Sequence, residues 1–315
     1  MELNDAMLDR LRQLEEKYSA MGQDMNSYLD GLLYADYLTY WDYIHLDTLL
    51  SLQNPRTPVP DERIFILYHQ ITELFFRLSL DAIEQLAQAQ PAPDAELFKR
   101  QIIRLNRYFE NLINSFDIMV DGMDRDEFLR FRMSLLPASG FQSVQYRMIE
   151  IASTDLRQLV HTSKRELTAD VDDVRLLNAV LYWKSGATEL ASGKKTLTLR
   201  QFEAKYAEEL VRFSQNFQSC NLRQLYLKLP PEAQNDAELR ELLREYDINV
   251  NVRWALSHYR SAVRYLDAKP KEIEATGGTN WQKYLPPRFQ RVVFFPELWT
   301  EDEMENWGKF LQKSA

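Results

Sequence analysis

Hydrophobic residues recur along this chain mainly at steps of three and four, which is the spacing of an amphipathic α-helix. The clearest stripe consists of Phe98, Ile102, Leu105, Phe109, Leu112, Phe116 and Met119. A second consists of Phe202, Tyr206, Leu210, Phe213 and Phe217. Segments that alternate at period two, as strands do, are hard to find, and the chain has only 9 glycines and 12 prolines. The pattern predicts an all-α fold built as a helical bundle.

Helix-breaking and capping residues mark where several of these helices begin and end. After three prolines between 55 and 60, Asp61 is placed to cap a helix that runs to about Gln88. Asp124 and Glu127 have the spacing of a capping box, and the helix they open must stop near Pro137. We expect the last long helix over about 236–268.

No low-complexity linker divides the 315 residues, so one large domain, 1–315, fits the sequence best. Residues from about 162 to 193 are less hydrophobic and end in Ser-Gly-Lys-Lys, which indicates a peripheral helical insertion over about 160–200. The N-terminal arm, about 1–53, ends in a segment so rich in tyrosine, 32–53, that we expect another surface to cover it.

Charge and cysteine content exclude several classes of function. The net charge of −9 is spread along the chain without a basic stripe, so nucleic acid is not an expected partner. No run approaches the roughly 18 apolar residues that span a bilayer, and the N-terminus lacks an apolar signal core, so we expect a cytoplasmic protein with no membrane partner. The single cysteine, Cys220, cannot form an intramolecular disulfide and argues against structural zinc and iron–sulfur clusters.

The four histidines are the main candidates for chemistry: His45, His69, His161 and His258. His69 and His258 fall on apolar faces of the two long helices expected to be central, where an imidazole is costly unless its polar atoms are satisfied. A lone buried histidine is ordinarily a hydrogen-bonded core residue. A neutral imidazole beside an aromatic groove, as His258 with Trp254 one turn earlier would be, is also what a haem iron requires. Periodicity alone does not choose between the two.

Other residues add partial signals. Phe65 lies one turn before His69 and gives an aromatic wall beside an imidazole, suited to a flat aromatic ligand. Arg132 follows Phe128 by one turn and could hold a carboxylate, although position alone favours an ordinary surface arginine. The chain has no Cys-x-x-Cys-His, no phosphate-binding glycine loop and no G-x-S-x-G elbow, so c-type haem, nucleotide and acyl-transfer chemistry lack support.

Several motifs, taken together, resemble the tryptophan 2,3-dioxygenase family over most of the chain. Phe131-Arg-Met-Ser-Leu-Leu-Pro-Ala-Ser-Gly-Phe-Gln-Ser143 is similar to the family pattern F-R-x-x-L-x-P-[AS]-S-G-F-Q-S. Phe65-Ile-Leu-Tyr-His-Gln70 resembles F-I-x-x-H-Q, and Tyr40-Trp-Asp-Tyr-Ile-His-Leu-Asp47 resembles Y-G-x-Y-L-x-L-D. Trp254-x-x-x-His258 and Thr276-Gly-Gly-Thr279 match the ligand helix and the substrate loop in the same order.

The resemblance implies the family's all-α bundle, a haem b cofactor, and the oxidative opening of the indole ring of L-tryptophan by O2 to N-formylkynurenine, the first step of tryptophan catabolism by the kynurenine route. His258 would be the axial ligand of the haem iron, with Trp254 and Ser139 beside the haem. His69 would act on the indole N–H, and whether it removes that proton is open.

The remaining implied roles concern the substrate and the assembly. Phe65 and Phe128 would contact the indole, while Arg132 and Thr276 would bind the charged end of the amino acid. Tyr40, Tyr43 and Ile44 would reach into a neighbouring subunit of a homotetramer, a dimer of dimers.

The sequence departs from the family pattern at a few positions that shape the pocket. Phe128 stands where tyrosine is common, Trp41 replaces a small residue, Phe75 stands where tryptophan is usual, and Trp281 stands where glycine is common. Two alternatives therefore stay open: a same-fold haem monooxygenase acting on another aromatic amino acid or indole derivative, and a non-catalytic helical binding protein.

Overall fold

The computed structural model describes residues 4–35, 38–90, 92–135, 142–188, 194–266 and 286–309. The chain forms two compact units, Met1–Asn54 and Pro55–Ala315.

The first unit consists of short helices with little of their surface buried. Its helices are α1 (Asp5–Ala20), α2 (Met25–Leu33), α3 (Tyr40–Tyr43) and α4 (Leu46–Ser51). None of the described residues in these four helices is buried. Large apolar side chains stay exposed instead, above all Leu32, Leu33 and Tyr34, each at least 74% exposed. The unit therefore does not build a core of its own.

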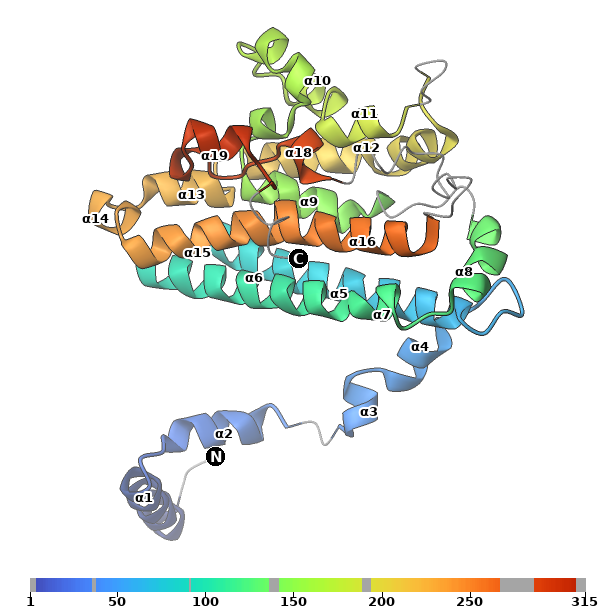
Figure 1. Cartoon of the computed structure of the whole chain (residues 1–315). Helices are drawn as coiled ribbons and strands as arrows, with labels where there is room; N and C mark the ends of the chain where they lie inside the picture. The colour runs from blue at the N-terminus through green and yellow to red at the C-terminus, as the bar shows by residue number, and fades with distance from the viewer. Residues whose placement is uncertain are drawn as a thin grey trace. The chain divides into compact units, whose positions relative to one another are not determined.

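The second unit is helical throughout its described part, apart from two isolated β-bridges, and the predicted all-α class is confirmed (Figure 1). Its helices are α5 (Glu62–Ala87), α6 (Ala95–Ser115), α7 (Asp117–Val120), α8 (Arg125–Phe131), α9 (Val144–Ser153), α10 (Val174–Ala179), α11 (Tyr182–Gly186), α12 (Leu197–Phe217), α13 (Leu222–Lys228), α14 (Pro231–Gln234), α15 (Ala237–Ile248), α16 (Trp254–Leu266), α18 (Pro287–Gln290) and α19 (Glu301–Glu305). Within the described ranges, no helix combines the length and the apolar character that crossing a membrane would take.

The core of this unit lies between its long helices. Figure 1 shows α5, α6, α15 and α16 running side by side, with α9 and α12 above them. The apolar stripe of α6 predicted from the sequence is buried: Phe98, Ile102, Leu105, Phe109 and Leu112 are each at most 1% exposed. Burying a side chain of this size contributes about 1.5–3 kcal/mol. The stripe is thus a main source of the unit's stability.

Of three helices predicted with definite bounds, one agrees with the structure and two differ from it. The α5 helix begins and ends within one residue of the predicted bounds. The helix opened by Asp124 is shorter than predicted, because α8 gives way to a 3-10 turn over Arg132–Leu135. The last long helix is not a continuous α-helix, because α15 and α16 are joined by a π-helical turn, Asn249–Arg253.

The segment over about 160–200 follows a 3-10 turn, Leu156–Leu159, and contains two more, Thr162–Lys164 and Glu166–Thr168, and then α10 and α11. Although its sequence is less hydrophobic than the rest, Val160, Leu181 and Trp183 are buried. The backbone N–H of His161 donates to Val180 O at 3.1 Å. The segment therefore packs on the bundle through a few large side chains.

A buried polar cluster joins α9 to α11. Arg147 Nη1 lies 2.7 Å from Glu150 Oε2 and 3.1 Å from the hydroxyl of Tyr182, which also donates to Glu150. Arg147 and Glu150 are 7% and 1% exposed. Burial lowers the pKa of Arg147, but the opposite charge of Glu150 and the hydroxyls of Tyr182 and Tyr146 together raise it above its usual value, so the guanidinium stays charged. The guanidinium also lies over the rings of Tyr146 and Trp183.

We expect Glu150→Leu to destabilise the protein by about 3–5 kcal/mol, because it leaves the Arg147 charge buried without its counter-ion. Adding Arg147→Met should recover most of that loss, since a buried ion pair is often replaceable by apolar residues of similar volume. Urea denaturation of both variants measures the free energies of unfolding. A single variant as stable as the parent protein would show that the ion pair contributes nothing.

Candidate active site

The N-termini of α5 and α8 are tied together by reciprocal hydrogen bonds. The Asp61 carboxylate accepts the backbone N–H of Asp124 at 2.6 Å, and the Glu127 carboxylate accepts the backbone N–H of Asp61 at 3.2 Å. Asp124 caps α8 as predicted, accepting the N–H groups of Asp126 and Glu127. The predicted capping box is wrong in its second half, because Glu127 bonds to α5 instead of to its own helix. The tie brings Phe128 and Phe131 beside Phe65.

Aromatic rings from three helices form a wall at this point. Phe65 of α5 lies 6.3 Å from Phe128 and 5.7 Å from Phe131, measured between ring centroids. Phe128 lies 4.7 Å from Tyr265 of α16, whose hydroxyl donates to the carbonyls of Val120 and Met123. The wall is therefore apolar. The bonds between α5 and α8 hold Phe65 beside Phe128, and the hydroxyl of Tyr265 fixes the ring on the other side of Phe128.

His69 lies one turn after Phe65, and its Nδ1 is 2.7 Å from the Phe65 carbonyl oxygen. Because a carbonyl only accepts, Nδ1 carries the proton in the neutral ring, which leaves Nε2 as a free acceptor. Burial lowers the pKa of His69, so it is neutral at pH 7. Its surface is nevertheless accessible to water. The ring therefore keeps part of its surface open to a ligand.

His258 of α16 repeats this arrangement. Its Nδ1 donates to the Trp254 carbonyl at 3.1 Å, which leaves the Nε2 lone pair available to a metal. Burial lowers the pKa of His258 to about 4, with a further contribution from His69. The Trp254 and Phe116 rings lie 4.4 and 4.6 Å from the imidazole, one edge-on and one tilted. The ring is therefore neutral and fixed in orientation.

A chain of ring contacts links the two imidazoles, which are 189 residues apart in the sequence. The Tyr68 ring contacts both His69 and Phe116, and Phe116 contacts His258. The imidazoles of α5 and α16 are thus connected through two aromatic side chains.

Arg132 brings a cation to the same region. It is 5% exposed at the start of the 3-10 turn that follows α8, and burial lowers the pKa of its guanidinium. Even so, its pKa lies far enough above 7 that the group stays charged. A buried cation beside an aromatic wall can bind an anion such as a carboxylate.

Ser139 and Thr276 lie outside the described residues. Tyr40, Tyr43 and Ile44 belong to the first unit, where Tyr40 and Tyr43 are 70% and 74% exposed.

Three residues at the site were not assigned to it from the sequence. Phe116 and Tyr265 follow the helical stripes and were expected to be buried, yet periodicity does not say against what. Phe131 precedes Arg132 in the most specific motif and is completely buried against Phe65 and Phe128. Its position within that motif was the one signal that pointed to it.

Comparison with known proteins agrees with this geometry. A family model for tryptophan 2,3-dioxygenase matches residues 31–190. The tryptophan 2,3-dioxygenase of Bradyrhizobium diazoefficiens is 31% identical over 83% of this chain and 91% of its own length. Those of Ruegeria sp. strain TM1040 and Polaromonas sp. strain JS666 are 30% and 27% identical over 85% and 83% of this chain, and over 92% and 86% of their own lengths.

The chain belongs to the tryptophan 2,3-dioxygenase family. The predicted resemblance is thereby confirmed, and it extends across both units. Two of the motifs meet in the fold, because Phe65, one turn before His69, lies 5.7 Å from Phe131, which precedes Arg132, measured between ring centroids. Within the described ranges, no three His, Cys, Asp or Glu side chains gather in a group that could hold a bare metal ion.

We expect both imidazoles of the cofactor-free protein to be Nδ1–H tautomers at pH 7, because both Nδ1 atoms donate to carbonyl oxygens one turn earlier. Nitrogen-15 NMR of histidine-labelled protein distinguishes the tautomers by the shifts of the two ring nitrogens. His69→Gln and His258→Gln assign the signals. An Nε2–H tautomer at either position would contradict the geometry described above.

Proposed function

We propose that the protein is a haem-dependent tryptophan 2,3-dioxygenase, which inserts both atoms of O2 into L-tryptophan, breaks the indole C2–C3 bond and gives N-formylkynurenine. The observation that carries this proposal is the pair of neutral imidazoles, His69 and His258, each with Nδ1 bonded to a carbonyl and Nε2 left as an acceptor, connected through the rings of Tyr68 and Phe116 in a chain of this family. No external reductant is consumed, because substrate plus O2 equals product in atoms and electrons.

His258 would hold haem b through Nε2. A haem iron with an open coordination position for O2 takes a single protein imidazole as its axial ligand, and that ring must be neutral and oriented by a bond to its other nitrogen. His258 meets these conditions, and Trp254 stands edge-on beside it. When bound, the haem supplies the O2 chemistry. Ser139 would lie at its edge.

His69 would receive the indole N–H on its free Nε2 and so fix which edge of the indole ring faces the haem. Phe65, whose ring is tilted against the His69 imidazole with centroids 4.1 Å apart, and Phe128 would pack on the indole faces. An apolar wall of this kind excludes water and strengthens the polar contacts that remain. A charged His69 would have no lone pair on Nε2, so its lowered pKa suits this role.

Arg132 would bind the substrate carboxylate through two parallel N–H···O bonds, and Thr276 would bind the ammonium or carboxylate. Together with the indole contact at His69, these bonds would hold an amino acid at both ends. That arrangement favours L-tryptophan over indole itself.

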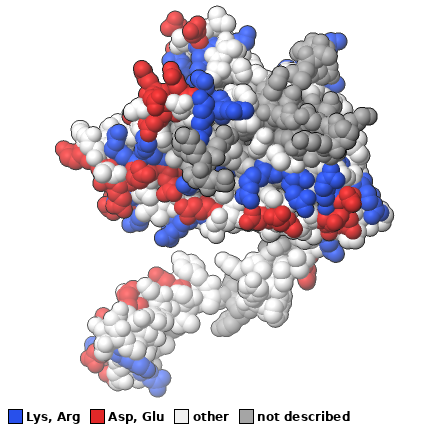
Figure 2. All heavy atoms as spheres, in the orientation of Figure 1, with Lys and Arg blue, Asp and Glu red and all other residues white. Residues whose placement is uncertain are grey.

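The N-terminal arm would complete the site of a second copy of the chain, with Tyr40, Tyr43 and Ile44 at that site, within a homotetramer. No described residue of α1 to α4 is fully buried within the chain, while 16 large hydrophobic side chains between residues 7 and 52 are exposed. Figure 2 shows the visible face of this unit as mostly uncharged beyond α1. Such a surface needs a partner in water.

We expect Arg132→Met to raise the KM for L-tryptophan about 30-fold or more, because a buried charge-assisted pair contributes about 2–3 kcal/mol. Arg130→Met is the matched control, since Arg130 is exposed on the same helix. The absorbance spectrum of the haem should not change in either variant. Equal KM values for the two variants would remove Arg132 from substrate binding.

Product mass after reaction under ¹⁸O2 tests the reaction itself. Reduced, haem-loaded protein with L-tryptophan should give a product that carries two labelled oxygen atoms. His258→Ala should abolish both haem binding and turnover, whereas His161→Ala, in the segment over 160–200, should preserve them. Uptake of one labelled atom would identify a monooxygenase instead, and haem bound as tightly by His258→Ala would refute the ligand assignment.

We expect Leu33→Glu to weaken subunit association at least tenfold, about 1.4 kcal/mol, because it would bury a charge between subunits. Leu167→Glu is the control, since Leu167 is 75% exposed in the second unit and Leu33 is 76% exposed in the first. Sedimentation velocity over a concentration series measures the association. A parent protein that is monomeric at all concentrations would refute the role of the arm.

A further inference from the structure

The helix that carries His258 contains one residue more than a regular α-helix would. The backbone N–H of Trp254 donates to the Asn249 carbonyl, five residues earlier, so the turn Asn249–Arg253 is π-helical. Both ends continue directly into α-helices, α15 before it and α16 after it. The π-turn is therefore a single insertion within one long helix.

This insertion decides which way His258 faces. Each residue of an α-helix advances the helical face by about 100°. In a regular helix, His258 would lie about 100° away from Leu239, the buried residue 19 positions earlier. One extra residue cancels this offset, because His258 then occupies the place of the eighteenth position, which completes five turns. The π-turn thus brings Trp254 and His258 onto the face already buried by Leu239, Leu243 and Tyr246.

Buried polar side chains support the π-turn. The Val250 carbonyl, which would accept the Trp254 N–H in an α-helix, accepts the hydroxyl of Tyr146 from α9 at 3.2 Å instead. Asn249 is fully buried, and its side-chain amide donates to Asn106 of α6 at 3.1 Å. These contacts satisfy groups that a π-turn would otherwise leave without a partner in an apolar core.

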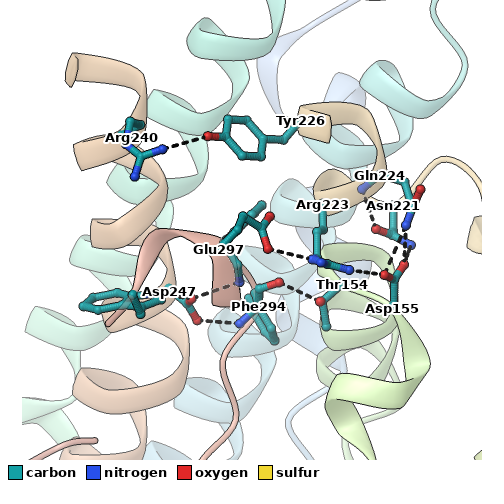
Figure 3. A network of polar contacts seen from close by, with 12 residues as sticks. Thr154, Asp155, Asn221, Arg223, Gln224, Tyr226, Arg240, Asp247, Phe294 and Glu297 are labelled. Atoms are coloured by element: carbon teal, nitrogen blue, oxygen red, sulfur yellow. Dashed lines mark hydrogen bonds and ion pairs between the residues drawn. The ribbon is translucent and has the colours of Figure 1, made fainter. Parts of the chain in front are cut away.

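The turn is also joined to the C-terminal segment through Asp247. Asn251 donates its side-chain amide to the Asp247 carboxylate at 2.8 Å. The same carboxylate accepts the backbone N–H groups of Phe294 and Phe295 at 2.9 and 3.2 Å and the indole N–H of Trp299 at 3.0 Å. Figure 3 shows Asp247 and Phe294 facing each other, with Thr154 donating to the Phe294 carbonyl from the other side.

We propose that Tyr146, Asn249 and Asn251 are positioning residues that hold this π-turn and so aim the Nε2 of His258 at the haem iron. The inference rests on the proposed function in one respect, which is that His258 is the haem ligand. It adds that the direction of the ligand depends on side chains from α9 and α6 and, through Asp247, on residues 294–299.

The test compares Tyr146→Phe with Tyr226→Phe in the haem-loaded protein. Both changes remove one hydroxyl that donates to a backbone carbonyl, from Tyr146 to Val250 and from Tyr226 to Gln234. Only the first touches the π-turn. We expect Tyr146→Phe to shift the iron–histidine stretching band in resonance Raman spectra and to speed haem transfer to apomyoglobin about tenfold. Tyr226→Phe should leave both unchanged at a comparable loss of unfolding free energy.

Asn251→Ala tests the proposal independently, since it removes the hydrogen bond to Asp247 and little core volume. It should shift the same band. Hydrogen exchange of the cofactor-free protein should be faster over residues 249–254 in both variants and unchanged in Tyr226→Phe.

The outcomes separate the inference from the proposed function. If the iron–histidine band of the parent protein is still present in the His258→Ala variant, His258 is not the haem ligand and the proposed function is refuted. A parent band that depends on His258 but is the same in Tyr146→Phe and Asn251→Ala would overturn the positioning role.

Discussion

Each of the two central imidazoles donates its Nδ1–H to the backbone carbonyl one helical turn before it, and the candidate site depends on that bond. Both imidazoles are neutral at pH 7, because the protein around each ring disfavours its charged form and lowers its pKa. A neutral ring has one donor and one acceptor nitrogen. Because each Nδ1–H donates to the carbonyl of Phe65 or Trp254, the Nε2 atom of each ring remains available as an acceptor. Helix geometry therefore sets the chemistry of the two rings.

Polar contacts at helix ends and breaks place these rings relative to one another. The Asp61–Asp124 and Glu127–Asp61 bonds tie α8 to α5, which brings Phe128 and Phe131 beside Phe65, one turn before His69. The π-turn after α15 places His258 on the helix face that Leu239, Leu243 and Tyr246 already bury. Apolar burial stabilises the bundle as a whole but has no direction. Directed hydrogen bonds are what distinguish this arrangement from other ways of packing the same helices.

The two units would contribute different parts of the proposed function. The second unit contains the buried core, both imidazoles and the buried guanidinium. The first exposes large apolar and aromatic side chains that its own helices do not cover. Membership of the tryptophan 2,3-dioxygenase family spans both. An arm of this composition is consistent with a protein whose site is finished by association.

The sequence by itself determined the all-α class, the bounds of α5 within a residue, the buried stripe of α6 and the family, because helical periodicity and short motifs are local properties. It also named His69, Arg132 and His258 as candidates. Only the tertiary structure decided that Phe116, Phe131 and Tyr265 belong to the same site, since periodicity says that a face is buried but not against what. The π-turn escaped the sequence for a related reason. Its support comes from Tyr146 and Asn106, more than 100 residues away, and no local pattern records a contact made at that separation.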